Sequence, residues 1–360
     1  MRLLFDGYWW DRGPAANRSV QRELITAWAA EFPDDEIIVA LRRDASGAGL
    51  PVHVERAGTR LWPHALSNVV ELGRIARRHD VDAVIPHNYT PWSGPSATFI
   101  HDVMFVEHPE WFSRSERLYF SAMLPTARRA GLVVTSSQTE ADRLQRHLPR
   151  AHAPVVAIAL GAPPAIVDAH PRRPEIAAGL DSFALTVGRL NVRKNLLAVI
   201  EAAAASAHIT PTSPLVVVGS AEHSGVGADL PAEVDRLRAD GRVLFAGRLE
   251  DDELAWLYRN CAVSISLSRD EGFGLTPIEA VACGAPLVVS DIPVHRENVG
   301  AVARLVPLDA APSAAAAAID LAWGSPSEAS LRHDVLIRCD WGAVVHRYRD
   351  AVARRFAIAN

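Results

Sequence analysis

Two glutamates bracket a glycine-rich turn in the second half of the chain. Glu271 and Glu279 stand on either side of Gly272, Phe273 and Gly274, and the turn follows the apolar run 262–267. Because glycine has no Cβ atom, a ligand can approach the main chain closely at such a turn. Carboxylates beside it suit a ligand that carries both phosphate and hydroxyl groups, which is the chemistry of a sugar nucleotide.

A short helix is predicted directly after this turn. Thr276 has the residue type of an N-cap, Pro277 that of a first helical position, and Gly284 gives a stop signal. The unpaired N–H groups and the positive dipole end of that helix favour an anion, most simply a phosphate. An alternative stays open, because Thr276 and Glu279 also have the spacing of a capping box, in which the glutamate only bonds back to the N-cap amide.

Two cations stand in another predicted strand-to-helix turn. Arg189 follows the apolar strand 183–187, and Lys194 precedes the helix 195–205. Lys194 is the only lysine, since the other 36 of the 37 basic residues are arginine. The spacing lets a guanidinium and an ammonium reach one diphosphate, the first with two hydrogen bonds and the second as a point charge. Two solvated surface cations are the alternative interpretation.

Candidate residues in the first half also follow predicted strands. His101 comes just after the strand 97–100, and Gly13 lies in the loop after the strand 3–5. Open α/β sheets bind their ligands at the carboxyl ends of the strands. We therefore expect His101 to bond a sugar hydroxyl or a leaving phosphate, with a structural histidine as the alternative. We expect Gly13 to allow close approach of a ligand.

The elements that must position these residues alternate between strand and helix. This alternation predicts mostly parallel sheets that are covered on both faces, hence an α/β fold. The proline-flanked stretch 170–174 has the composition of a linker between two halves. The predicted helix 111–129 carries four arginines and presents either a solvated face or a contact for anionic lipid headgroups. Further strands are predicted at 36–41, 52–55, 83–85, 132–135, 155–159, 215–218, 243–245 and 287–290, and further helices at 17–30, 67–78 and 341–356.

Composition excludes several classes of protein. Of the 360 residues, 49% are hydrophobic and 22% are charged, as in soluble globular proteins, and the length fits two domains. The net charge of -5 shows no excess of basic residues of the kind that binds nucleic acid. No apolar run has the length of a membrane span or of a signal-peptide core, so we expect a cytoplasmic protein. The three cysteines and fourteen histidines show no disulfide or metal-ligand spacing, so no metal is expected.

Several motifs together resemble a known family. GRLNVRKNL at 188–196, FAGRLEDDELAWLY at 245–258 and EGFGLTPIE at 271–279 are similar to motifs of the retaining GT-B glycosyltransferases of glycosyltransferase family 4. HDVMFVEHPEWFS at 101–113 resembles the segment that carries the family's active-site histidine, and CDWGAVVHRYRD at 339–350 resembles its terminal helix. The resemblance implies two Rossmann-like domains that face each other across a cleft. They are an acceptor-side domain at 1–165 and a nucleotide-sugar-binding domain at 175–338, with a terminal helix at 339–360 that packs back on the first.

The resemblance also implies a role for each candidate residue. His101 would lie beside the reacting sugar and Glu271 would contact the transferred sugar, while Arg189 and Lys194 would bind the donor diphosphate and stabilise the leaving group. Fixed cations and a helix start stabilise the charge of a departing diphosphate, so neither a divalent metal nor a cofactor is expected. The other residues expected to bind the nucleotide sugar are Gly13, Gly272, Phe273, Gly274, Leu275, Thr276 and Glu279, with Glu279 on the ribose hydroxyls.

The resemblance favours one donor and leaves the acceptor open. HDVMFVEHPEWFS and RKNL look most like bacterial mannosyltransferases of polysaccharide assembly, which favours GDP-mannose, with UDP- and dTDP-sugars as alternatives. The acceptor would be a glycan, a lipid-linked glycan or a small natural product, and a lipid-linked one would imply peripheral membrane contact.

Two other functions remain as alternatives. One is an enzyme that resembles a nucleotide-sugar 2-epimerase, which would turn over nucleotide without depending on an acceptor. The other is a non-catalytic glycosyltransferase-like subunit, whose mark would be the loss of Arg189, Lys194, Glu271 or Glu279, and all four are present. Hydride transfer is disfavoured because no GxGxxG motif follows a predicted strand.

Overall fold

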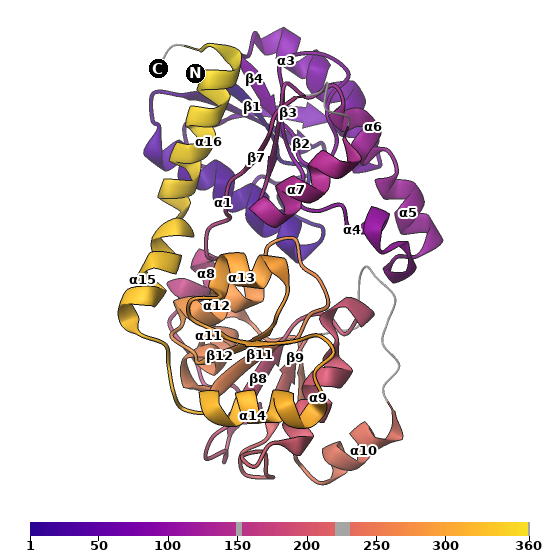
Figure 1. Ribbon diagram of the computed structural model, residues 1–360. Coiled ribbons are helices and arrows are strands. Elements are labelled where there is room, and N and C mark those ends of the chain that lie inside the picture. The colour runs from indigo at the N-terminus through magenta and orange to yellow at the C-terminus, as the bar shows by residue number, and fades with distance from the viewer. Residues whose placement is uncertain (149–152, 220–230, 359–360) are drawn as a thin grey trace. The chain divides into compact units, whose positions relative to one another are not determined.

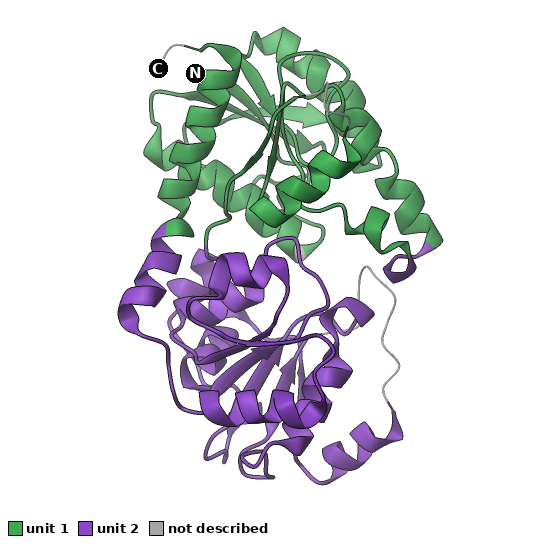
Figure 2. Ribbon diagram, in the orientation of Figure 1, with its two compact units in different colours: residues 1–109, 114–161, 338–360 green, residues 110–113, 162–337 purple. Residues whose placement is uncertain are grey.

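The computed structural model describes residues 1–148, 153–219 and 231–358 (Figure 1). The chain divides into two compact units (Figure 2). Unit 1 comprises residues 1–109, 114–161 and 338–360, and unit 2 comprises residues 110–113 and 162–337.

The expected domain boundary needs a correction. The first long segment of unit 1 ends at residue 161 rather than 165, and the stretch 170–174 that we expected to be a linker belongs to unit 2. Arg172 connects this stretch to unit 2, because its Nε donates to Asp252 Oδ2 and its Nη1 to Glu253 Oε1, both over 2.8 Å. The charged stretch is thus anchored to a helix of unit 2 instead of spanning freely between the units.

The strands of unit 1 are all parallel in its described part. One sheet has the order β3-β2-β1-β4 and another the order β5-β6-β7, and the isolated parallel bridges Val84–Ser96 and His87–Phe99 join β4 to the β5 side. The middle of β2, residues 37–41, is buried, as expected for a parallel strand covered on both faces. The strands are β1 Arg2–Asp6, β2 Glu36–Arg42, β3 Glu55–Thr59, β4 Ala83–Ile85, β5 Ala97–Phe99, β6 Leu132–Thr135 and β7 Val155–Ala157.

Helices cover the sheets of unit 1, and α16 contributes to this layer although it follows unit 2 in sequence (Figure 2). It packs on α1, where the rings of Trp28 and Tyr348 meet edge to face with centroids 5.9 Å apart. Arg349 donates to both oxygens of Asp35 over 2.9 and 3.0 Å. The helical elements are α1 Ala15–Glu31, α2 His64–Leu66, a π-helical turn η1 Ser67–Leu72, α3 Gly73–His79, α4 Met104–Glu107, η2 Pro109–Trp111, α5 Arg114–Phe120, α6 Met123–Ala127, α7 Gln138–His147 and α16 Trp341–Phe356.

Two predicted elements of unit 1 are wrong. The strand expected at 52–55 is a turn, closed by a hydrogen bond from Val54 N–H to Pro51 O, and the strand β3 begins only at Glu55. The helix expected at 111–129 is broken into α5 and α6. Pro125 lies in the first turn of α6, where a residue without an N–H group is tolerated, so the break precedes it.

Unit 2 has one six-stranded parallel sheet in its described part, with the order β10-β9-β8-β11-β12-β13. Counted within the unit, this is the strand order 3-2-1-4-5-6 of a dinucleotide-binding α/β sheet. The alanine-rich helices α9 and α14 pack against each other, because small side chains let two helices approach closely. The strands are β8 Ala184–Val187, β9 Leu215–Val218, β10 Val243–Gly247, β11 Val263–Ser266, β12 Leu287–Ser290 and β13 Arg304–Val306.

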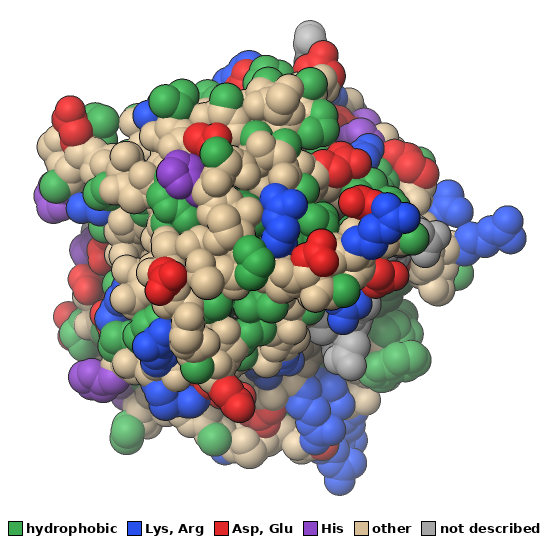
Figure 3. Space-filling view, turned by 90° about the horizontal axis from the view of Figure 1, so that it is seen from below, with side chains coloured by type: hydrophobic (Ala, Val, Ile, Leu, Met, Phe, Trp, Pro, Cys, Tyr) green, Lys and Arg blue, Asp and Glu red, His purple; other side chains and the backbone are tan. Residues whose placement is uncertain are grey.

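The helices of unit 2 follow these strands in alternation (Figure 1). On the face drawn in Figure 3, acidic and basic side chains are scattered among uncharged surface, and several basic side chains gather at the lower right. The helical elements are α8 Pro164–Val167, η3 Glu175–Ala177, η4 Val192–Lys194, α9 Leu196–Ala205, α10 Ala232–Ala239, α11 Asp251–Asn260, α12 Leu275–Ala282, α13 Pro293–Val299, α14 Pro312–Ala322 and α15 Ala329–Arg338.

Candidate functional site

Two loops meet at the point where the strand order of unit 2 reverses. This reversal lies between β8 and β11, and open α/β sheets bind ligands at the carboxyl ends of the strands on either side of such a point. The loop after β8 carries Arg189 and ends in η4 with Lys194, and the loop after β11 carries Glu271. The fold therefore brings together Lys194 and Glu271, which are separated by 77 positions in the sequence.

Glu271 lies at the centre of the contacts in this site. Its side chain is only 8% exposed. Lys194 Nζ donates to Oε1 over 2.7 Å, Ser268 Oγ donates to the same oxygen over 2.8 Å, and Arg193 Nη1 donates to Oε2. Arg193 also donates to Asp270 O over 3.1 Å. The carboxylate is thus paired with two cations and held in one place.

The charges in this group depend on one another. Burial alone would raise the pKa of Glu271, but Arg193 and Lys194 hold that pKa well below its ordinary range. Burial lowers the pKa of Lys194, and the Glu271 carboxylate opposes this shift. The site therefore presents two fixed and poorly hydrated cations, which an entering diphosphate would share with the carboxylate.

Arg189 lies closer to the end of β8 than these two cations. Its side chain is partly buried, and the neighbouring Gly188 supports the stem of Lys194, because a Cβ atom on Gly188 would lie 3.2 Å from Lys194 Cε. The cations that the structure joins to Glu271 are Arg193 and Lys194. The prediction assigned Lys194 to the donor diphosphate and Glu271 to the transferred sugar, so it did not include their ion pair, and Arg193 had no role in it.

The helix after the glycine turn begins two residues before the predicted first helical position. Its N-cap is Gly274, whose φ of 86° is in the left-handed region that glycine adopts easily, and α12 begins at Leu275. Thr276 and Pro277 therefore occupy the second and third helical positions, so their predicted roles as N-cap and first residue are wrong. Pro277 has no N–H group, and the helix start offers the N–H groups around Gly274 to a ligand instead.

Buried side chains support the glycine turn from behind. His295 Nδ1 lies 3.0 Å from Ser290 O, and Ser290 Oγ in turn donates to Ser268 O. His295 Nε2 is buried without a partner among the described residues, and it would lie 3.6 Å from a Cβ atom on Gly274. Asn298 Nδ2 donates to Phe273 O over 2.8 Å. These contacts fix the turn, and no motif in the sequence had indicated them.

Glu279 does not take part in a capping box. Helix α12 has no side-chain hydrogen bond at its N-cap, and Glu279 Oε2 instead accepts a hydrogen bond from Tyr258 Oη over 2.8 Å. Burial raises the pKa of Glu279 to about 7, although Tyr258 and Lys194 both oppose the rise. This side chain therefore changes its charge near neutral pH, and it offers a ligand hydroxyl a charged acceptor above that range and a neutral carboxyl below it.

The pKa of Glu279 predicts how nucleotide affinity depends on pH. If Glu279 accepts hydrogen bonds from ribose hydroxyls, as the resemblance implies, its protonation below pH 7 replaces a charged acceptor by a neutral and weaker one. The dissociation constant should then rise by up to about tenfold for each pH unit below 7. Calorimetric titration of a bound nucleoside diphosphate between pH 5.5 and 8.5 measures this effect, and Glu279→Gln should remove it. The terminal phosphate of the nucleotide also titrates near pH 6 and contributes equally in both proteins, so a pH dependence as steep in Glu279→Gln as in the wild type would contradict the assignment.

A second polar cluster lies in unit 1, at the carboxyl ends of β1 and β4. Asp6 is buried, and its Oδ2 accepts hydrogen bonds from His64 Nε2 and Asn68 Nδ2, both over 2.8 Å, and from the His87 N–H over 3.2 Å. Its Oδ1 accepts from the Tyr8 N–H over 2.9 Å. The strand order of unit 1 also reverses between β1 and β4, so this cluster occupies the equivalent place in its sheet.

His101 lies beside this cluster. Its ring centroid is 5.6 Å from that of His87, and its N–H donates to Asn88 Oδ1 over 3.4 Å. His101 Nε2, His87 Nδ1, His64 Nδ1 and Asn68 Oδ1 are all buried without a partner among the described residues. Buried polar atoms are normally hydrogen-bonded, so this concentration of unpaired atoms fits a ligand with several hydroxyl groups.

The charges in unit 1 are also fixed by burial. Burial lowers the pKa of His101 to about 3 and that of His87 to about 4. Burial would raise the pKa of Asp6, but His64 beside it holds that pKa at about 2. At neutral pH, Asp6 is thus an anion, and both His87 and His101 are neutral imidazoles with one N–H group and one acceptor nitrogen each.

Removing the Asp6 carboxylate should destabilise unit 1 strongly. Asp6→Ala leaves the N–H groups of His64, Asn68 and His87 without their acceptor, and the loss of one member of such a buried charged network costs roughly 3–5 kcal/mol. Because the folded-state pKa of Asp6 lies below its ordinary value of 3.8, its stabilising effect is complete above about pH 4 and is lost as the pH falls to about 2. Hydrogen exchange followed by mass spectrometry should show faster exchange in β1 and β4 and unchanged exchange in β8 and β11. Unchanged protection in β1 would refute the assignment.

Gly13 also belongs to unit 1. A Cβ atom there would lie 2.2 Å from the ring of Trp9, and φ is +133°, so the packing of Trp9 requires glycine at this position.

The sequence contains one Asp-x-Asp triplet, Asp80 to Asp82, and Asp82 accepts a hydrogen bond from the Arg2 N–H at the amino end of β1. Among the described residues, no group of three or more histidines, cysteines or carboxylates is placed to hold a metal ion.

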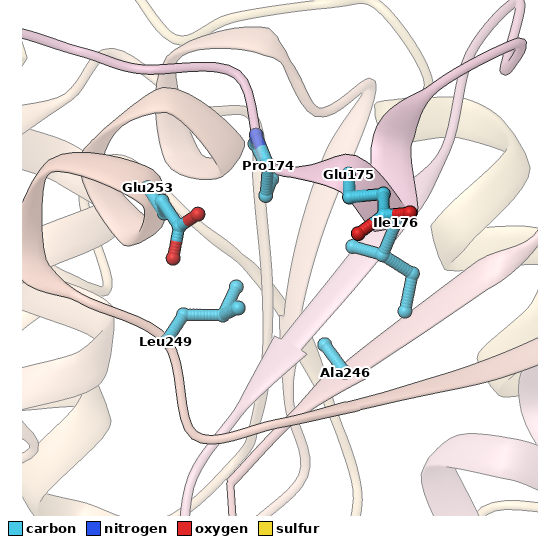
Figure 4. Close-up of a pocket in the computed structure, with 6 residues that line it drawn as sticks. All are labelled: Pro174, Glu175, Ile176, Ala246, Leu249 and Glu253. Atoms are coloured by element: carbon cyan, nitrogen blue, oxygen red, sulfur yellow. The ribbon is translucent and has the colours of Figure 1, made fainter.

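One surface hollow of unit 2 holds none of the candidate residues. It has a volume of about 430 Å³ and lies between η3, the end of β10 and the start of α11 (Figure 4). Its charged lining consists of the carboxylates Glu175 and Glu253, and Glu253 already accepts from Arg172. A site for a diphosphate needs cations or N–H groups, so this hollow is not the candidate site.

Across the described ranges, no helix is both long and apolar enough to cross a bilayer.

Sequence comparisons identify relatives of the chain. A family model described as "Glycosyl transferases group 1" matches residues 153–334, which is more than half of the 360 residues. The serotype-specific mannosyltransferase WbdA of Escherichia coli is 26% identical over 225 residues, which make up 60% of this chain and 27% of that protein. The chain thus matches little more than a quarter of that relative's length. The GDP-mannose:cellobiosyl-diphosphopolyprenol alpha-mannosyltransferase of Xanthomonas campestris is 24% identical over 250 residues, 68% of this chain and 64% of that protein.

Solved structures share the fold over the whole chain. A sucrose-phosphate synthase from Thermosynechococcus elongatus has a TM-score of 0.71 at 19% identity and covers 100% of both chains. HepE of Anabaena, solved in complex with UDP and glucose, has a TM-score of 0.66 at 19% identity and covers 98% of this chain and 100% of its own. These similarities confirm the predicted α/β fold of the GT-B type.

Proposed function

Since the chain belongs to the family of group 1 glycosyl transferases, we propose that it moves a hexose from a nucleoside-diphosphate sugar to an acceptor hydroxyl, with retention of the anomeric configuration. The observation that carries this proposal is the pairing of Glu271 with Arg193 and Lys194 beside the glycine turn. It combines cations for a diphosphate with a carboxylate for sugar hydroxyls in one place.

The proposed roles follow from these contacts. Lys194 and Arg189 bind the donor diphosphate. Arg193 adds a third positive charge beside it, and its ion pair with Glu271 holds it in place. As the bond between the sugar and the phosphate breaks, negative charge builds on the leaving diphosphate, and fixed cations stabilise it without reorganisation. The N–H groups at the start of α12 act in the same direction. The proposal therefore includes independence from added divalent metal, which transfer assays in EDTA would test.

The sugar is placed by carboxylates and neutral imidazoles in this proposal. Glu271 contacts the hydroxyls of the transferred sugar, Glu279 those of the ribose, and His101 lies beside the reacting sugar. A neutral His101 suits this role, because it can donate to one hydroxyl and accept from another.

GDP-mannose is the proposed donor. The relatives named as mannosyltransferases support it, and the name of the Xanthomonas relative gives GDP-mannose as its donor. UDP-sugars are the second choice, because HepE, a structural neighbour, was solved with UDP and glucose. The proposed acceptor is a glycan. If it is linked to a lipid, the chain would also contact the membrane surface, through Arg114 and Arg117 of α5 and through Arg128 and Arg129, which follow α6.

Calorimetric titration with GDP, UDP, dTDP and ADP in the absence of metal tests this proposal. We expect GDP to bind at least tenfold more tightly than the other three. Equal affinity for all four would remove the donor assignment, and binding of none would favour the alternative of a non-catalytic subunit. An enzyme that resembles a 2-epimerase would release nucleoside diphosphate from the donor at a rate that does not depend on the acceptor.

A further inference from the structure

A pocket in unit 1 carries an excess of positive charge. It has a volume of about 410 Å³, within the range of about 300–1,000 Å³ that is typical of small-ligand sites. Three arginines line it against one aspartate, in a chain whose net charge is -5. Its lining includes Tyr8, Arg42, Arg43, Asp44, Arg60 and Trp62.

The pocket lies at the edge of the sheet where a ligand is expected. Tyr8 follows β1, Arg42 ends β2, and Arg60 follows β3, and these three strands are parallel neighbours. The pocket therefore opens at their carboxyl ends, the edge at which open α/β sheets bind ligands. None of the residues assigned above to the donor lies in its lining.

Two of its arginines are available to an anion. Arg42 is already used, because its Nε and Nη2 donate to the two oxygens of Asp44 over 3.1 and 3.0 Å. The guanidinium groups of Arg43 and Arg60 have no ion pair or hydrogen bond in the part of the chain that the structure describes. Two such guanidiniums in the lining of one pocket, at the ends of the neighbouring strands β2 and β3, fit a doubly charged group such as a phosphate or diphosphate.

The loops that carry these arginines are held in place. The Glu71 carboxylate accepts the N–H groups of Arg60 and Leu61 over 2.9 to 3.1 Å. On the other side, Arg56 Nη2 donates to Ser46 O over 2.9 Å and to Gly47 O over 2.7 Å. Because the loops are ordered before a ligand arrives, less conformational entropy is lost on binding.

Apolar side chains lie beside the cations. Trp62 is 77% exposed and Leu61 is 38% exposed, which places a large aromatic surface next to Arg60. A ligand that joins a phosphate to an apolar chain would cover both kinds of surface. This combination distinguishes the pocket from a purely ionic patch.

We propose that this pocket binds the phosphate or diphosphate group of the acceptor, with Arg43 and Arg60 as its ligands. This inference rests on the proposed function, because only a transferase has an acceptor. It adds the substrate class, since it assigns the protein an acceptor that carries phosphate, either linked to a lipid or as a soluble phosphorylated sugar.

The test is direct binding of farnesyl diphosphate, measured by calorimetry in Lys194→Ala so that the donor site of unit 2 contributes little. Adding Arg43→Gln and Arg60→Gln should raise the dissociation constant at least roughly tenfold, because each replaced guanidinium removes a charge-assisted contact. Both arginines are exposed, so the variant should fold. The matched control adds Arg78→Gln and Arg354→Gln, which remove the same charge outside the pocket.

Three outcomes would overturn the inference. The first is that farnesyl diphosphate does not bind to the Lys194→Ala protein. The second is an equal loss of affinity in the control variant. The third is that the pocket binds a sugar carboxylate, glucuronate, but no diphosphate. The source of the phosphate is settled by comparison with sodium pyrophosphate. If farnesyl diphosphate binds more tightly and Trp62→Ala removes the difference, the acceptor is lipid-linked; equal binding of the two identifies a soluble phosphorylated acceptor.

Failure here is distinguishable from failure of the proposed function. The diphosphate titration depends only on unit 1, whereas the nucleotide titration depends on unit 2. Nucleotide binding without farnesyl diphosphate binding would refute the pocket and leave the transferase. Binding of farnesyl diphosphate without any nucleotide binding would refute the transferase, and with it the role of the bound phosphate as part of an acceptor.

Discussion

Lys194→Ala is expected to reduce the turnover number of hexose transfer by roughly 10²–10³-fold, the loss that follows removal of one fixed electrostatic contact in a transition state. Lys194 supplies the ammonium that lies 2.7 Å from Glu271 Oε1, at the place where the leaving diphosphate is proposed to bind. The same variant should bind the nucleoside diphosphate more weakly. Radiolabelled product formation measures the first effect and calorimetry the second.

Two further variants make this result specific. Lys194→Arg keeps the positive charge but replaces the compact ammonium beside Gly188 by a larger, planar guanidinium. It should therefore recover only part of the activity that Lys194→Ala loses. Arg238→Ala removes an exposed cation of the same unit and should leave turnover unchanged. If Lys194→Ala retained the wild-type turnover number and nucleotide affinity, the diphosphate assignment would fall.

Glu271→Gln should lose both activity and stability. The substitution leaves Lys194 and Arg193 beside a neutral amide, and breaking such a buried pair costs roughly 3–5 kcal/mol. Because the folded-state pKa of Glu271 lies below its ordinary value of 4.5, the wild-type carboxylate stabilises unit 2 fully above that pH and progressively less below it. The variant should lack this pH dependence. Hydrogen exchange in β8 and β11 reports the stability, and transfer assays at a temperature where the variant is folded report the activity.

Glu233→Gln is the matched control for this experiment. Glu233 pairs with Arg236 over 2.9 Å on the surface of α10, where both side chains are mostly exposed. Exposed pairs contribute about 0–1 kcal/mol, so the control should change neither property measurably. A Glu271→Gln protein that transfers hexose at the wild-type rate would show that the carboxylate is only structural.

Much of the strand pattern could be predicted from the sequence. The strands 83–85, 132–135, 215–218 and 287–290 have the predicted bounds, because strands buried on both faces are continuous runs of apolar residues. The terminal helix 341–356 has them too, since its apolar positions recur at the helical period. These signals are local and depend little on the rest of the fold.

The contacts of the candidate site depend on parts of the chain that are distant in sequence. Arg193 reaches Glu271 only because η4 turns its side chain toward the loop after β11, and the Arg-Lys dipeptide alone does not show which cation does so. His64 lies 58 positions from Asp6, so no spacing rule could pair them. The start of α12 was misplaced because the left-handed backbone of Gly274 provides the N-cap, where the side-chain rules favoured Thr276.

The place of α16 in unit 1 has a consequence for synthesis of the protein. The chain leaves unit 1 at residue 161 and returns at residue 338, so the long segment of unit 2 is translated completely before α16 exists. Domains generally fold as units while the ribosome extends the chain. Unit 2 is therefore able to fold first, whereas the surface of α1 around Trp28 stays uncovered until Tyr348 has been added. We expect unit 1 to depend on chaperones during this interval, although its first strand, β1, is made before any residue of unit 2.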